Sequence, residues 1–283
     1  MAVGDPRGIG PEVVRKALQQ PLDADVRIVG GWEDGAGGGE KPPGDLEAGR
    51  AAAQNIEAAA RLALSGEADA IVTGPVNKLA LHAAGYRFPG VTEFLAHIAG
   101  DIPVAMMLTT GRLRVVLVTT HLSLRDAIAS VTTERVVQAG RIATDALRQW
   151  WGITTPRLAL CALNPHAGES GLFGDEDERL LRPAATALDA AGPLPADTVF
   201  VRALRGEFDA VLAPYHDVGM TAVKVSGFGT GVNVTLGLPF IRTSPDHGTA
   251  FDIAGKGIAD AGSMRASLEL AVQLVGARQL RGD

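Results

Sequence analysis

Short apolar runs alternate with amphipathic stretches along most of the chain. The apolar runs predict strands at Asp25–Gly30, Ala68–Gly74, Val104–Leu108, Leu113–Thr119, Leu158–Leu163, Ala210–Ala213 and Val232–Leu236. The amphipathic stretches predict helices from Pro11 to Leu18 and over Leu46–Ser65, Thr92–Ala99, Thr133–Trp151, Glu176–Ala191 and Ile258–Val275. Apolar strands between helices indicate an α/β fold whose sheet is largely covered. The intervening Gly31–Asp45, dense in glycine and proline, is predicted to be a loop.

Composition limits the class of protein without naming its chemistry. With 283 residues the chain has room for two medium domains, and its net charge of −6 gives no general attraction to nucleic acid or to an anionic membrane. The single cysteine, Cys161, lies in an apolar run and is predicted to pack as a small hydrophobe. No apolar run is long enough to cross a bilayer and the start shows no signal-peptide pattern, so we expect a cytoplasmic protein.

Histidines follow three of the predicted strands. His121, His166 and His216 each come within a few residues of an apolar run, in loops where α/β proteins carry their functional groups. If the strands are neighbours, three imidazoles form a normal set of ligands for Zn²⁺ or a similar divalent ion. For each histidine alone, a hydrogen-bonded structural role is the alternative. Asp217 is either a partner that orients His216 or a helix cap.

A second group of polar residues is spaced through the C-terminal third. Lys224, Asn233 and Arg242 combine a point charge, an amide and a guanidinium fork, which together suit a phosphate or a carboxylate. The alternative is two surface cations and a turn asparagine. Arg242 weakens that alternative, because it follows a long apolar run.

The glycine-rich segment His247–Gly257 lies near the C-terminal end of this region. It does not match GxGxxG, so a standard dinucleotide-binding fold is not indicated. Its glycines, with Thr249 and the Asp252 carboxylate, nevertheless suit an adenosine, and the carboxylate would favour NAD over NADP.

These segments together resemble the 4-hydroxythreonine-4-phosphate dehydrogenases, NAD-dependent enzymes of pyridoxal phosphate biosynthesis. The matching segments, in order over nearly the whole chain, are Gly4–Pro6, Gly8–Glu12, Gly74–Lys78, Thr92–Leu95, Thr119–Leu122, Leu163–Glu169, Pro195–Thr198, Tyr215–Asp217, Thr235–Pro239 and Arg242–Gly257. The last of these is also similar to the adenosine-binding loop of isocitrate and isopropylmalate dehydrogenases.

The resemblance implies a two-domain α/β fold of the isocitrate/isopropylmalate dehydrogenase type with a central cleft. We expect a cofactor-side domain of residues 1–105 with 228–283, and a metal and dimerisation domain of residues 106–227. A homodimer with sites near the subunit interface is also implied.

The resemblance assigns ligands to residues as well. It implies a divalent metal (Zn, Mg, Mn or Co) on His121, His166 and His216, and a small phosphorylated substrate on Thr92, Lys224, Asn233 and Arg242. NAD is expected on Gly248, Thr249, Asp252, Ile253 and Gly255.

The implied reaction oxidises the secondary hydroxyl of 4-phosphooxy-L-threonine to 2-amino-3-oxo-4-phosphooxybutanoate, which then loses CO₂. Lys78 and Asp246 are candidates for the group that removes the proton, by charge and loop position. Val91 stands where the resembled family has a substrate-binding histidine. A phosphorylated threonate or erythronate, or a dihydrodiol carboxylate, is therefore an alternative substrate, and a non-catalytic metal- or nucleotide-binding relative is an alternative of another class.

Overall fold

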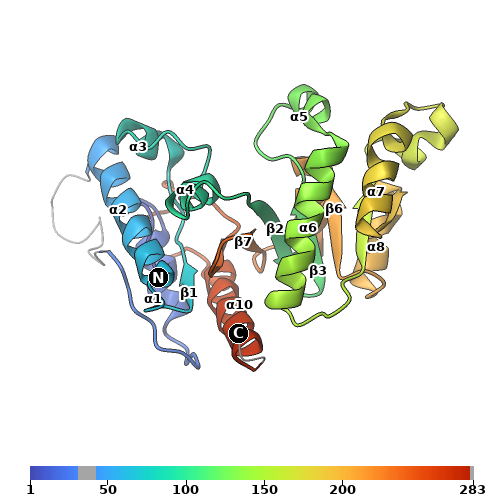
Figure 1. Ribbon diagram of the computed structural model, residues 1–283. Helices are drawn as coiled ribbons and strands as arrows, with labels where there is room; N and C mark the ends of the chain where they lie inside the picture. The colour runs from blue at the N-terminus through green and yellow to red at the C-terminus, as the bar shows by residue number, and fades with distance from the viewer. Residues whose placement is uncertain (31–42, 281–283) are drawn as a thin grey trace. The chain divides into compact units, whose positions relative to one another are not determined.

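Buried strands alternate with helices in the computed structural model, which describes residues 1–30 and 43–280 (Figure 1). The chain divides into unit 1, Met1–Pro103 with Val232–Asp283, and unit 2, Val104–Gly231. The predicted domain limits differ from these by at most four residues (227 against 231). The predicted loop Gly31–Asp45 lies outside the described residues except for 43–45, and Asp45 already begins a helix.

Unit 1 holds three paired strands and five helices among its described residues. Its elements are α1 (Gly10–Ala17), α2 (Asp45–Leu64), β1 (Ala70–Val72), α3 (Lys78–Ala83), α4 (Val91–Ile98), β7 (Val232–Leu236), β8 (Ile241–Pro245) and α10 (Gly262–Gln279). Strand β8 lies in the middle, parallel to β1 and antiparallel to β7. A core of α1 and α10 residues covers the strands, with Val13, Val14, Met264 and Leu268 buried.

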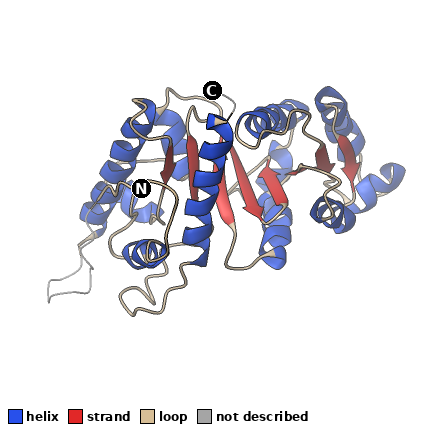
Figure 2. Cartoon of the chain, turned by 90° about the horizontal axis from the view of Figure 1, so that it is seen from below, coloured by secondary structure: helices blue, strands red, loops and turns tan. Residues whose placement is uncertain are grey.

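Unit 2 holds five adjacent strands, in the order β2-β3-β6-β4-β5. Its elements are β2 (Ala105–Thr110), β3 (Leu113–Leu117), α5 (Leu124–Ser130), α6 (Thr133–Gln149), β4 (Leu158–Cys161), a π-helical turn (Asp177–Leu181), α7 (Arg182–Leu188), β5 (Ala191–Leu194), α8 (Ala196–Leu204), β6 (Ala210–Ala213) and α9 (His216–Ser226). Strands β3, β6, β4 and β5 are parallel, and β2 is antiparallel to β3. Figure 2 shows the strands in red among the blue helices.

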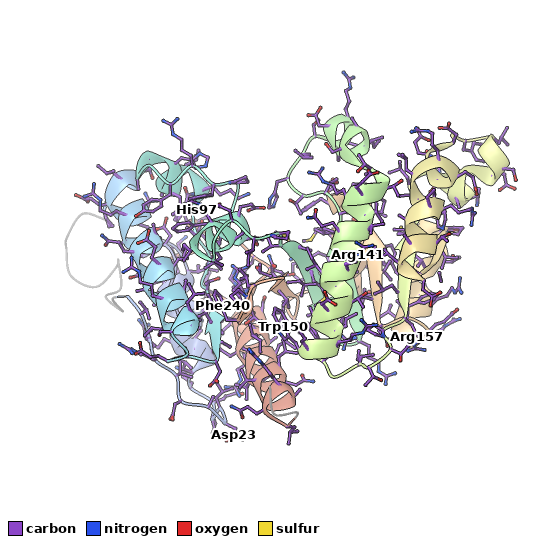
Figure 3. The ribbon with its side chains drawn as sticks, viewed as in Figure 1. Asp23, His97, Arg141, Trp150, Arg157 and Phe240 are labelled. Atoms are coloured by element: carbon purple, nitrogen blue, oxygen red, sulfur yellow. The ribbon has the colours of Figure 1, made fainter. Side chains whose placement is uncertain are left out.

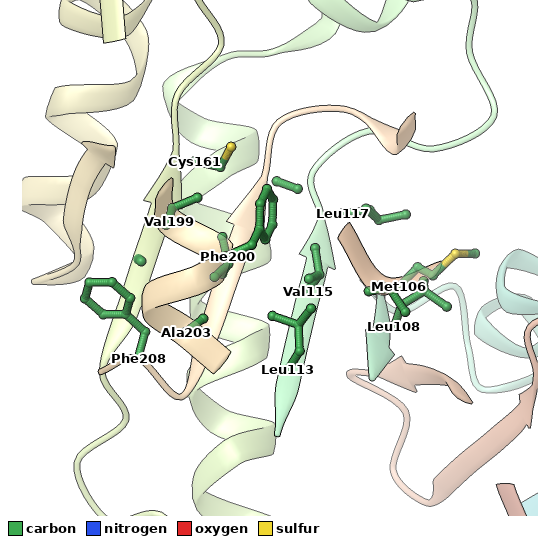
Figure 4. Packing of buried hydrophobic residues seen from close by; sticks show 14 residues of the cluster. Met106, Leu108, Leu113, Val115, Leu117, Cys161, Val199, Phe200, Ala203 and Phe208 are labelled. Atoms are coloured by element: carbon green, nitrogen blue, oxygen red, sulfur yellow. The ribbon is translucent and has the colours of Figure 1, made fainter. Parts of the chain in front are cut away.

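Alternation along the strands gives unit 2 a core on each face of its sheet. Val115 and Val211 pair across β3 and β6 and belong to the cluster that packs against α8 and α9, together with Phe200 (Figure 4). The residues that follow them along each strand, Val116 and Leu212, are also fully buried, and they point to the opposite face of the sheet. That second face is covered by α6, whose C-terminal neighbour Trp150 is 4% exposed (Figure 3).

Two of the predicted elements are wrong, and the predicted helix Ile258–Val275 is displaced along the chain, since α10 spans Gly262–Gln279. Asp25–Gly30 forms only an isolated parallel bridge between Val29 and Ala2, rather than a strand. The predicted helix Glu176–Ala191 ends at Leu188, because Asp189 takes a left-handed conformation (φ 51°) and the chain then enters β5. Within β5, a Cβ on Gly192 would lie 2.6 Å from the Leu160 carbonyl oxygen of β4, so only glycine allows this approach.

Candidate active site

Arg242 is a charged side chain inside unit 1. It is 3% exposed, on the central strand β8. Its Nε and Nη2 donate to Thr73 Oγ1 at 3.1 and 2.6 Å, and its Nη1 donates to Thr235 Oγ1 at 2.9 Å. Thr235 is brought there by the antiparallel pairing of β7 with β8, and Thr73 follows the parallel strand β1. The guanidinium is thus fixed by two neutral hydroxyls.

Burial has an electrostatic consequence for this guanidinium. Desolvation lowers the pKa of Arg242 to about 10, and the nearby Glu93 carboxylate opposes that change. The side chain is therefore still a cation at neutral pH. Binding of an anion would stabilise this buried cation, whose hydrogen-bond partners are neutral hydroxyls, because charge-assisted hydrogen bonds in a low dielectric are strong.

Thr92 and Asn233 lie in the same unit as this guanidinium. Thr92 is the second residue of α4, is 5% exposed, and its Oγ1 lies 3.3 Å from Thr235 Oγ1. Asn233 precedes Thr235 by two residues on β7, so both side chains point to the same face. Asn233 Oδ1 is buried without a hydrogen-bond partner. Thr73 and Thr235 are not among the site residues predicted from the sequence, although the two-residue spacing of Thr235 from Asn233 indicates the shared face.

Lys224, the fourth predicted substrate residue, belongs to unit 2. It lies in the last turn of α9, and its Nζ is 5.6 Å from the centre of the Phe228 ring. The structure therefore brings together Thr92, Asn233 and Arg242, while Lys224 is carried by a different unit.

His121 and His216 meet in unit 2. They follow β3 and β6, which are adjacent and parallel, so both reach the carboxyl edge of the sheet. Their ring centres are 5.6 Å apart. A Cβ on Gly219 would lie 2.6 Å from Leu117 Cδ2, so this glycine lets α9 lie close against β3. His216 Nδ1 is 2.6 Å from Asp217 Oδ1, a contact that orients the imidazole.

His166 follows β4, the other parallel neighbour of β6, but it is not grouped with this pair. Its ring lies 6.3 Å from that of Phe173, centre to centre. Across residues 1–30 and 43–280, no three or more histidine, cysteine, aspartate or glutamate side chains form a group able to hold a metal ion. The predicted convergence of the three histidines is thus met by two of them within one chain.

The loop that carries His166 has an unusual backbone. Five consecutive residues, His166 to Ser170, have positive φ between 41° and 80°, and only Gly168 among them is a glycine. A left-handed conformation costs an ordinary residue roughly 1–2 kcal/mol, so surrounding contacts must hold the loop. Asp177, fully buried, accepts the backbone N–H groups of Leu163 at 2.8 Å and Asn164 at 3.0 Å.

Left-handed backbone also occurs at His121, where φ is 43°. Such strain in residues other than glycine persists only where the surroundings impose it, and it is typical of functional sites. Two of the three predicted metal ligands, His121 and His166, therefore lie on left-handed backbone.

The predicted cofactor residues lie in the segment between β8 and α10. Gly248, Asp252 and Gly255 are exposed, while Thr249 and Ile253 are half-buried. The Thr249 carbonyl accepts the Ile9 N–H at 2.9 Å. Ile253 packs against the core formed by α1 and α10, and this contact anchors the segment to unit 1.

The two candidate proton-accepting residues differ in surroundings. Lys78 is exposed at the first position of α3, after its N-cap Asn77. Asp246 is half-buried, and its backbone N–H and side chain both contact the Ser263 hydroxyl, at 3.1 and 3.3 Å.

Similarity to known proteins gives these features a context. The structure superposes on isocitrate dehydrogenase from Methylococcus capsulatus with a TM-score of 0.51, at 17% identity, covering 98% of this chain and 85% of that chain. It superposes on 4-hydroxythreonine-4-phosphate dehydrogenase from Klebsiella pneumoniae with a TM-score of 0.85, at 39% identity, covering 97% and 98% of the two chains. The chain is thus a dehydrogenase with an α/β fold related to isocitrate dehydrogenase.

Curated relatives define the family. The chain is 43% identical to 4-hydroxythreonine-4-phosphate dehydrogenase from Paracoccus denitrificans, with 98% of each chain covered. It is 47% identical to D-threonate 4-phosphate dehydrogenase from Cupriavidus necator, over 95% of this chain and 83% of that protein. Residues 33–271 match the family described as "Pyridoxal phosphate biosynthetic protein PdxA". The chain belongs to the PdxA family.

The helices were compared with the length and apolar character of a membrane span. Over the described part of the chain, none combines the length and the apolar character that crossing a bilayer requires.

Proposed function

We propose that the chain oxidises the secondary hydroxyl of a phosphorylated hydroxy acid, using NAD and a divalent metal ion. The first substrate we propose is 4-phosphooxy-L-threonine, which would give 2-amino-3-oxo-4-phosphooxybutanoate and then lose CO₂. Relatives that bear the corresponding name support this choice. The NAD requirement and the two-step reaction rest on the family resemblance.

The observation that carries the proposal is the buried guanidinium of Arg242. Its hydrogen bonds go to the hydroxyls of Thr73 and Thr235, and they leave guanidinium N–H groups for an incoming phosphate. The Thr92 hydroxyl lies next to Thr235, at the start of α4, where the helix dipole also favours an anion. We infer that Thr92, Asn233 and Arg242 bind the phosphate end of the substrate, with Lys224 contributing charge.

The histidines fit a divalent metal ion in part. His121 and His216 offer two imidazoles at one sheet edge, and the contact with Asp217 on Nδ1 leaves Nε2 of His216 for a metal. We retain His166, after the neighbouring strand, as the third proposed ligand. A metal ion in such a site stabilises the negative charge of an alkoxide. The imidazoles must be neutral to bind it, which makes binding weaker in acid.

We assign NAD to Gly248, Thr249, Asp252, Ile253 and Gly255. The exposed Asp252 carboxylate is suited to accept hydrogen bonds from ribose hydroxyls, and it would repel a 2′-phosphate. NAD supplies the hydride acceptor. Lys78 and Asp246 remain the proposed candidates for taking the hydroxyl proton.

D-threonate 4-phosphate is the second candidate substrate. Val91 is the first residue of α4, directly before Thr92, and it offers only an apolar surface where the resembled family has a histidine. The two substrates differ in whether an amino or a hydroxyl group stands beside the carboxylate. The relative from Cupriavidus necator bears the name of the second. The replacement of a histidine by Val91, next to Thr92, therefore affects the choice between the two substrates.

We further propose that the chain works as a homodimer. Large apolar side chains on unit 2 are exposed, among them Val225 at 83% and Phe228 at 85%. Burying such side chains between subunits is favourable. Light scattering that gives the mass of one chain at micromolar concentration would refute the dimer.

An NADH-release screen tests the proposed function. The purified protein with Zn²⁺, Mg²⁺ or Mn²⁺ is mixed with NAD and, in separate reactions, 4-phosphooxy-L-threonine, D-threonate 4-phosphate, erythronate 4-phosphate or a dihydrodiol carboxylate. We expect NADH with a phosphorylated acid, and fastest with 4-phosphooxy-L-threonine. A faster reaction with D-threonate 4-phosphate would select the second candidate. Turnover of the dihydrodiol alone would overturn the phosphate assignment, and no turnover of any of these substrates would contradict the proposed reaction.

A further inference from the structure

The segment that leads into helix α1 contacts the N-terminal part of the proposed cofactor loop, residues 246–261. The Ile9 N–H, just before the helix, donates to the Thr249 carbonyl at 2.9 Å. A Cβ on Gly8 would lie 2.7 Å from the same carbonyl oxygen, so the two segments approach as closely as glycine allows. This contact fixes the loop near Gly248 and Thr249.

The same helix holds the other end of the loop through a pair of charged side chains. Lys16 Nζ donates to the carbonyls of Gly257 at 2.9 Å and Ala259 at 2.7 Å. Glu12 Oε1 accepts the Ala259 N–H at 2.8 Å. Glu12 and Lys16 are one turn apart on α1, and their charged atoms lie 2.8 Å from each other. One ion pair therefore satisfies three polar contacts to the loop backbone.

The burial of Glu12 makes the loop contacts of this pair significant. Glu12 is 8% exposed, and its second oxygen, Oε2, is buried without a hydrogen-bond partner. A buried carboxylate is stabilised here by Lys16 and by the Ala259 N–H, so both contacts are hard to give up. Of the residues assigned to NAD, Asp252, Ile253 and Gly255 lie between the Thr249 contact and the contacts at Gly257 and Ala259, and Gly248 directly precedes Thr249.

We propose that Glu12 and Lys16 are positioning residues for dinucleotide binding. They hold the loop in its binding conformation before the cofactor arrives, which reduces the ordering that binding would otherwise require. Neither side chain needs to touch the cofactor. This inference rests on the proposed function, because it takes residues 248–255 as the NAD site.

Lys16→Met tests the proposal, because methionine keeps much of the side-chain length and removes the donor. We expect the Kd for NAD, measured by titration without substrate, to rise about tenfold, since a hydrogen bond from a charged group is worth roughly this factor. The KM for NAD should rise in parallel, while kcat and the KM of the phosphorylated substrate change less than about twofold. Glu12→Gln, which retains an acceptor for Ala259, should have a smaller effect.

Arg61→Met is the matched control. Arg61 forms an ion pair of the same i,i+4 spacing with Glu57 on α2, at 3.3 Å, and it is exposed. Its loss should leave the Kd for NAD unchanged. If Lys16→Met and Glu12→Gln lower the melting temperature and leave the Kd for NAD as in wild type, the pair has a structural role alone and the proposal is wrong.

Asp252→Ala separates this proposal from the function on which it rests. If Asp252→Ala leaves NAD binding unchanged, the cofactor site itself is misassigned. If Asp252→Ala weakens NAD binding while both α1 variants bind it normally, the site stands and the positioning role is refuted. If Lys16→Met does not fold, Glu12→Gln and Lys16→Gln carry the test, and wild-type NAD binding by both overturns it.

Discussion

The two units hold their candidate functional groups in opposite ways. In unit 1, Arg242 is buried in the sheet and fixed by threonine hydroxyls. In unit 2, His121 and His166 are exposed, at the ends of parallel strands, and both have a left-handed backbone. A preformed buried cation suits a ligand that brings its own negative charge. Exposed imidazoles on strained loops suit a small metal ion that brings its ligands together when it binds.

Replacing His216 should give the largest effect in this comparison. His216→Ala removes an imidazole that faces His121, and we expect metal-dependent NADH formation to fall more than about 100-fold, beyond what loss of an outer partner of a ligand costs. Asp217→Asn, which alters only that partner, should lose roughly 10- to 100-fold. His82→Ala is the control, since His82 bonds the Phe88 carbonyl in unit 1. Undiminished turnover by His216→Ala would remove the metal from the proposal.

Arg242→Met should weaken binding of the phosphorylated substrate. The KM for a phosphorylated substrate should rise roughly 10- to 100-fold, because a hydrogen bond to a charged group contributes about 1.5–3 kcal/mol. Removing the guanidinium also takes the counter-charge from the nearby Glu93 carboxylate, so chemical denaturation should show some loss of stability, and the rise in KM is the readout that identifies the binding role. An unchanged KM together with a large loss of stability would make Arg242 a structural residue.

Asp177→Asn should loosen the loop that carries His166. An amide oxygen replaces one of the two acceptors for the Leu163 and Asn164 N–H groups, so one buried donor loses its partner, which costs about 1–3 kcal/mol. Urea denaturation measures this loss. Asp175→Asn is a suitable control, because Asp175 is exposed and pairs with Arg179 on the surface. Equal stability of the two variants would contradict the account of the loop.

The smallest effect on activity is expected from Cys161, which takes no part in either site. Burial, and then Asp177, raise the pKa of the Cys161 thiol to about 12 from the usual 9.0. The folded chain therefore keeps a proton that the unfolded chain releases, and the free energy of unfolding should fall as pH rises from about 9 to 12, by up to about 1.4 kcal/mol per pH unit. Cys161→Ala should remove this part of the slope. The same slope in both proteins would argue against the burial.

The sequence predicted the fold where local pattern and tertiary structure agree. The α/β class and most of the long elements follow from periodicity, and α6 begins at the predicted Thr133. Asp25–Gly30 is apolar enough for a strand, but only Val29 has a partner, in Ala2. The end of α7 was missed because a left-handed Asp189, rather than a glycine, stops the helix.

The candidate site could be predicted only in part. Arg242 and the three histidines could be picked out from the sequence, because each is a charged or metal-ligating residue that follows an apolar run. Their partners were not, since Thr73 lies 169 positions from Arg242 and reaches it only through the pairing of β1 with β8. The sequence also gave no sign that His121 and His216 meet while His166 stays apart.

The most direct test of the central claim compares one substrate with and without its phosphate. The metal-loaded wild-type protein is assayed for NADH at 340 nm with 4-phosphooxy-L-threonine and with 4-hydroxy-L-threonine at equal concentrations below KM. A phosphate bound by the buried guanidinium of Arg242 predicts a rate at least about 100-fold higher with the phosphorylated acid. Equal rates with the two acids would contradict the account.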